Sequence, residues 1–156
     1  MTWGQRAVAA LEGDRGEAVA LEADGIRVRF RVEEADRVGC AILGLCAEDL
    51  RASAKDADGL KAWGDRIAGR ITYLMERVAA IEADGASGMA LLRSVPPDLR
   101  GGARAYYEVV LKSPGTLTLS RYRYQNGDRT RTEVPCALTR DAFERLVDDL
   151  VGTMRE

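Results

Sequence analysis

The stretch LTLSRYRYQNGDRTRTEVPCALTRDAFERLVDDLVGTM, residues 117–154, decides the fold of this chain. Asn126-Gly127 lies between two β-prone segments and predicts a two-residue hairpin turn, because Asn and Gly tolerate the positive φ angles that such a turn needs. In that register the numbers of paired residues sum to 253, so Leu119 faces Val134. The two strands would then share an apolar face at the base of the hairpin.

Arginines and tyrosines gather near the tip of this hairpin. The predicted register places Tyr122 opposite Arg131 and Tyr124 opposite Arg129, and an arginine over a tyrosine ring adds a cation–π attraction. The candidate binding residues are Arg121, Tyr122, Arg123, Tyr124, Arg129 and Arg131. Such side chains suit stacking on bases, binding of phosphates or contact with an acidic protein. The alternative interpretation is a solvated strand face whose arginines protect an edge from aggregation.

A helix follows the hairpin. Pro135 lacks an N–H and ends the strand, and Thr139 is placed to cap the first helical turn. Apolar residues then recur on a 3.6-residue period at Phe143, Leu146, Val147, Leu150, Val151 and Met154. This spacing predicts a helix that buries one stripe against the sheet.

A second hairpin lies closer to the N-terminus. Asp24-Gly25 predicts another two-residue turn, and in its register paired numbers sum to 49, with Glu22 opposite Arg27. Apolar and polar residues alternate on both strands, which predicts one packed face and one wet face.

The remaining elements follow from periodicity and turn residues. The sequence predicts a helix from Thr2 to Gly13, a turn over 33–36, a strand over 38–46, a helix from Asp56 or Asp58 to Arg70, strands near 71–82, 89–95 and 103–112, and a loop over 98–102. For residues 71–82, continuation of the preceding helix is the alternative.

The predicted order is α-β-β-β-α-β-β-β-β-β-α. It indicates an α+β fold with a mainly antiparallel sheet of about seven to eight strands and helices packed on one face. Residues 1–156 are predicted to form a single domain, with a weak internal duplication of 14–70 and 71–156.

Composition narrows the functional classes. The chain has no histidine, which excludes His-based triads and His metal sites, and its net charge of −2 disfavours a generic nucleic-acid binder. The bias toward arginine over lysine suggests a bacterial GC-rich coding sequence. Cys40, Cys46 and Cys136 have no regular spacing and are predicted to be buried, reduced thiols. With an N-terminus unlike a signal peptide, they favour a cytoplasmic protein.

These patterns predict a non-enzymatic binding or adaptor module with no cofactor, no metal and no membrane partner. Its partner would be an acidic protein surface or a second copy of the chain. The alternative is nucleic-acid or polyanion binding through the hairpin at 121–131, and salt dependence separates the two. An enzyme with a carboxylate or Cys site is the third, less supported possibility.

Overall fold

The computed structural model describes residues 1–156 apart from 14–15, 75, 96–97, 101, 126 and 128. The helices are α1 (Trp3–Ala9), α2 (Ala57–Arg70) and α3 (Arg140–Gly152), with short 3-10 turns η1 (Ala10–Glu12) and η2 (Thr153–Arg155). The strands are β1 (Ala18–Ala23), β2 (Ile26–Ala35), β3 (Gly39–Asp49), β4 (Arg77–Asp84), β5 (Met89–Val95), β6 (Asp98–Arg100), β7 (Ala103–Lys112), β8 (Thr116–Gln125), β9 (Thr132–Val134) and β10 (Cys136–Thr139).

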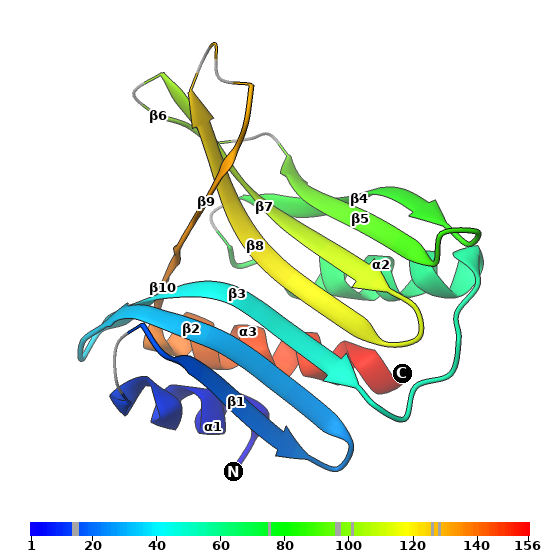
Figure 1. Ribbon diagram of the computed structural model, residues 1–156, viewed down its shortest axis with the longest axis horizontal. Coiled ribbons are helices and arrows are strands. Elements are labelled where there is room, and N and C mark those ends of the chain that lie inside the picture. The colour runs from blue at the N-terminus through cyan, green and yellow to red at the C-terminus, as the bar shows by residue number, and fades with distance from the viewer. Residues whose placement is uncertain (14–15, 75, 96–97, 101, 126, 128) are drawn as a thin grey trace.

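Within the described residues the ten strands form one antiparallel sheet. Its main path runs β1-β2-β3-β8-β7-β5-β4, while β6, β9 and β10 pair with β7, β8 and β3. The three α-helices lie on the same side of the sheet: α1 and α3 under the end formed by β1 to β3, and α2 under β4 and β5 (Figure 1). The predicted α+β class and the helices on one face are confirmed. The internal duplication stays a prediction.

The closing helix packs as its spacing predicts. Thr139 accepts a hydrogen bond from the backbone N–H of Ala142 at 3.0 Å, which caps the first turn of α3. The whole apolar stripe is buried: Phe143, Leu146, Val147, Leu150, Val151 and Met154. The ring of Phe143 meets the ring of Phe30 edge to face, with centroids 5.2 Å apart. This contact joins α3 to the centre of β2.

The first helix packs tightly on the last. Thr2 and Gln5 form a capping box at the start of α1, and the backbone N–H of Gly4 donates to the carboxylate of Asp148 at 2.7 Å. A Cβ atom built on Gly4 would lie only 2.1 Å from the carbonyl oxygen of Glu144. Position 4 therefore has no room for a side chain while α1 stays in place.

Gly4→Ala is expected to push α1 away from α3 and to lower the free energy of unfolding by about 1–3 kcal/mol, as overpacking does. Gly69→Ala is the matched control, since an added Cβ there meets nothing within 4 Å and alanine favours a helix interior. Urea unfolding followed by circular dichroism measures both. If Gly4→Ala were as stable as the parent protein, the close packing of α1 on α3 would be wrong.

The N-terminal hairpin has the predicted register. All six pairs of β1 and β2 sum to 49, and Asp24 and Gly25 have φ angles of 54° and 77°. Glu22 accepts a hydrogen bond from Nε of Arg27 at 3.1 Å, as the predicted opposition implies. The turn predicted at 33–36 is wrong, because β2 continues to Ala35.

The register predicted for the C-terminal hairpin is wrong by two residues. Arg121 pairs with Val134, so paired numbers sum to 255, and the predicted turn falls partly on Asn126, outside the described residues. Leu119 faces Val109 of β7 and Leu45 of β3 instead of Val134. The reason is that β8 is a central strand, and its apolar half is already paired on both sides.

Other boundaries differ from the predicted ones. Helix α2 ends at Arg70 as predicted, but the next strand starts only at Arg77, and the loop predicted over 98–102 contains β6. Pro135 interrupts the C-terminal strand without ending it, because the chain continues as β10 along β3. The strand predicted over 38–46 extends to Asp49.

Candidate functional site

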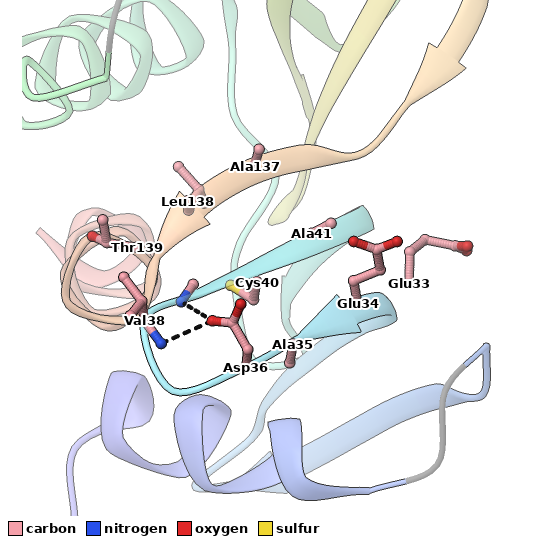
Figure 2. A pocket seen from close by; sticks show the side chains of 11 residues that line it. Glu33, Glu34, Ala35, Asp36, Val38, Cys40, Ala41, Ala137, Leu138 and Thr139 are labelled. Carbon is pink, nitrogen blue, oxygen red and sulfur yellow. Dashed lines mark hydrogen bonds between the residues drawn. The ribbon is translucent and has the colours of Figure 1, made fainter.

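A hollow of about 780 Å³ lies where β2, β3 and β10 meet (Figure 2). Asp36 turns inward and accepts the backbone N–H groups of Val38 and Gly39, both at 2.8 Å. These hydrogen bonds lower the pKa of Asp36, and its ionised carboxylate stabilises the turn between β2 and β3. Glu33 and Glu34 stand at the opposite end of the hollow (Figure 2). No pair of acids therefore converges here for acid–base chemistry.

The cysteines differ in exposure. Cys40 and Cys136 are buried as predicted, and burial raises the pKa of Cys40 to about 11 and that of Cys136 to about 12. Both stay protonated near neutral pH, which makes them poor nucleophiles. Cys46 is only half-buried, contrary to the prediction, and its sulfur lies 3.8 Å from Nη2 of Arg29. The sequence missed this because residue 46 faces the side of the sheet that no helix covers.

The six predicted binding residues do not form one surface. Arg121 points to the helix side, where its Nη2 donates to Glu76 at 3.0 Å and its guanidinium lies 4.4 Å from the centroid of the Tyr107 ring. Its side chain is 15% exposed and that of Glu76 is 10% exposed. Arg121 is therefore part of the packed structure and not of a binding surface. Arg123 shares its side of β8 but is exposed, and Arg129 is exposed as well.

Tyr122, Tyr124 and Arg131 lie on the uncovered face and cluster around Glu108. This buried carboxylate accepts three hydrogen bonds, two from Arg131 at 2.7 and 3.2 Å and one from Nε of Arg93 at 2.9 Å. Arg131 stacks on the Tyr122 ring with its guanidinium carbon 3.6 Å from the centroid, so this predicted cation–π pair is present despite the shifted register. The bidentate geometry holds both charges in fixed positions.

The aromatic rings complete the cluster. Tyr106 is uncharged and contacts both Arg131 and Arg93. Its hydroxyl accepts a hydrogen bond from Arg131 at 3.0 Å, and the guanidinium carbon of Arg93 lies 5.4 Å from its ring centroid. Tyr124 meets Tyr106 edge to face, and its hydroxyl accepts from Arg104 at 3.4 Å. Stacked rings and fixed guanidinium groups form a rigid basic and aromatic surface.

The electrostatics of the cluster favour ionised Glu108. Burial acts to raise the pKa of Glu108, but the hydrogen bonds from Arg131 and Arg93 outweigh it, so the pKa lies below its ordinary value. Glu108 was not among the residues that the sequence patterns singled out. A lone glutamate within the apolar and aromatic strand Ala103–Lys112 was the signal, since a buried charge needs a partner.

The strand register maps charge over the whole uncovered face. From the level of Arg29 and Thr118 toward the tip of β8 stand six arginines and four glutamates, here called the basic region: Arg29, Arg31, Arg77, Arg93, Arg104, Arg131, Glu34, Glu82, Glu108 and Glu133. Toward the opposite end stand three acids and two bases: Glu22, Glu48, Asp84, Arg27 and Lys112. The described residues thus give a charge of +2 at one end and −1 at the other.

Other site classes have little support. Among the described residues, no group of three or more His, Cys, Asp or Glu side chains could hold a metal ion. No helix in the described parts of the chain is long and apolar enough to cross a membrane.

Comparison with protein-family models, with curated proteins and with solved structures finds no match to this chain.

Proposed function

We propose that this protein is a binding module that holds an acidic segment of another protein on the uncovered face of its sheet. One observation carries the proposal: the face without helices is polarised, with six arginines toward one end and an aromatic cluster that fixes two of them. Interfaces of this kind use arginine and tyrosine as anchors, because both contribute area, hydrogen bonds and charge.

The interaction surface in this proposal differs from the hairpin tip. Arg121 and Arg131 are each paired with a glutamate, which weakens the case for nucleic-acid or polyanion binding through residues 121–131. Arg29 and Arg31 are exposed on β2 and take the main role instead. An enzyme with a carboxylate or Cys site has less support, because Asp36, Glu108 and two of the cysteines are committed to hydrogen bonds or buried.

Two further features complete the proposal. The free cysteines fit a reducing compartment, so we place the module in the cytoplasm. A second copy of the chain is the alternative partner, since β1 and β4 are the outer strands of the main sheet path and can pair with another edge.

Fluorescence anisotropy tests the proposal with a labelled nonapeptide of alternating glutamate and threonine. We expect it to bind, and we expect the double variant Arg29→Glu and Arg31→Glu to bind about tenfold more weakly, a loss of about 1.4 kcal/mol. A labelled twelve-nucleotide single strand of DNA is the comparison probe. It should bind more weakly than the peptide, because it carries more negative charge than the peptide and the net charge of −2 on the chain therefore repels it more strongly.

The matched control is Lys61→Glu with Arg51→Glu, which makes the same charge change at two exposed positions outside the basic region. Its affinity should stay close to that of the parent protein. Equal losses in both double variants would mean that only net charge matters, and tighter binding of the DNA would favour the polyanion alternative. Either result contradicts the proposal.

A further inference from the structure

The proposed function, on which this inference rests, leaves open which acidic sequences would fit. The uncovered face has a hollow of about 500 Å³ above β2 and β3, bounded by Arg29, Arg31, Leu43, Cys46 and Glu133. Two exposed arginines, Arg29 and Arg31, border this concave surface. The spacing of the arginines around the hollow therefore predicts the spacing of acidic residues in the partner.

A β-bulge forms the hollow. Arg29 pairs with Cys46, whereas Arg31 pairs with Leu43, so β3 has one residue more than β2 over this interval. Gly44 lies in the bulge with a φ angle of 62°, and a Cβ atom built there would meet nothing within 4 Å. The extra residue bends the strand and leaves open space above its backbone.

The charges at the hollow are arranged asymmetrically. Arg29 and Arg31 are exposed on one side. Within the described residues the Arg31 side chain makes no hydrogen bond or ion pair, and Arg29 makes one hydrogen bond, to the sulfur of Cys46. Leu43 and Cys46 supply an apolar floor, and Glu133 from β9 stands on the lining of the same hollow. An anion bound in the hollow would be attracted by the guanidinium groups of Arg29 and Arg31 and repelled by the carboxylate of Glu133.

We infer that the hollow binds two carboxylates placed two residues apart, at i and i+2, in an extended acidic segment. Arg29 and Arg31 are two residues apart on one strand, so their Cα atoms are separated by about 6.6–6.8 Å. Side chains at i and i+2 of an extended partner point the same way with the same spacing, whereas neighbouring residues point to opposite sides. A partner segment along β2 can thus present one carboxylate to each arginine.

Glutamate fits this site better than aspartate. Its additional methylene groups can lie on Leu43 and Cys46 while the carboxylate reaches the guanidinium group. Glu133 disfavours a third carboxylate beyond the pair, by like-charge repulsion. The partner sequence is therefore expected to contain Glu-x-Glu followed by uncharged residues.

Nuclear magnetic resonance titration tests the inference with three nonapeptides that contain two glutamates and seven threonines. The glutamates stand at i and i+1, at i and i+2, or at i and i+3, so that net charge and composition are identical. The i and i+2 peptide should bind about threefold to fivefold more tightly, the contribution of about one additional exposed ion pair. The largest shifts should fall on Arg29, Arg31, Leu43 and Cys46.

Two variants sharpen the test. Arg31→Gln should remove the preference for the i and i+2 peptide, while Arg51→Gln, which changes an exposed arginine in the turn after β3, should retain it. Equal affinities for the three peptides would overturn the inference and leave the proposed function standing. Absence of binding by any acidic peptide would overturn both. Self-association abolished by Arg31→Gln would show that a second copy occupies the hollow, and would also overturn the inference.

Discussion

Phe143→Ala is expected to lower the free energy of unfolding by about 3–5 kcal/mol, the range for removing a buried aromatic side chain. Phe143 is fully buried, and its ring packs edge to face on Phe30 of β2. Alanine would leave a cavity between α3 and the sheet, and the aromatic contact would be lost. Urea unfolding followed by far-ultraviolet circular dichroism measures the change.

The control for this measurement is Lys61→Ala, an exposed substitution on α2 that should change stability by no more than about 0.5 kcal/mol. Phe143→Leu should fall between the two, because it retains most of the buried apolar volume. A loss below about 1 kcal/mol in Phe143→Ala would mean that α3 does not rest on β2 through this residue, and the helix-covered face would have to be reconsidered.

Glu108→Ala is expected to produce the second largest loss, about 2–4 kcal/mol. It removes three charge-assisted hydrogen bonds and leaves Arg93 and Arg131 without their shared carboxylate. The expected cost lies below that of breaking a fully buried ion pair, because the two arginine side chains are 43% and 37% exposed and water can solvate them. Equilibrium unfolding at pH 7 measures it.

The same carboxylate gives the stability a defined pH dependence. The pKa of Glu108 lies below its ordinary value, and a hydrogen bond from Arg155 lowers the pKa of Asp49 as well. The unfolded chain therefore binds protons more readily at these groups than the folded protein does. Their contribution is complete above the unfolded-state values, about 4.3 for Glu and 3.9 for Asp, and is lost as the pH falls through the folded-state values.

Glu108→Gln should consequently show a flatter loss of stability between about pH 5 and pH 2 than the parent protein. Glu82→Gln, which changes an exposed glutamate on the same face, should retain the parent profile. Identical profiles for Glu108→Gln and the parent protein would contradict the role of Glu108 as an ionised centre of the cluster.

Local signals accounted for much of the fold. The hairpin at Asp24-Gly25 has its predicted register because a two-residue turn leaves only one pairing for the strands that flank it. Helices α2 and α3 were equally predictable, since caps at Asp56 and Thr139 and an apolar stripe specify where they start and which side is buried. These features depend on residues close together in the chain.

The candidate site depended on contacts between distant residues. Glu108 and Arg131 meet only because the pairing of β9 with β8, and of β8 with β7, brings residue 131 close to β7. Arg121 pairs with Glu76, which lies 45 residues earlier, and is therefore not available on the surface. The sequence identified arginines and tyrosines as the unusual side chains. It could not show which of them a glutamate from another strand would neutralise.

In the two hairpins the sequence by itself determined which side chains share a face, and the tertiary structure decided which strands lie opposite one another. In the C-terminal hairpin the true pairing differs from the predicted one by two residues. Because side chains alternate with a period of two, such a slip leaves every residue on its original face, and the apolar pattern is equally satisfied in both registers. Only the pairing of β8 with β3 and β7 selects one register, through contacts that no local pattern encodes.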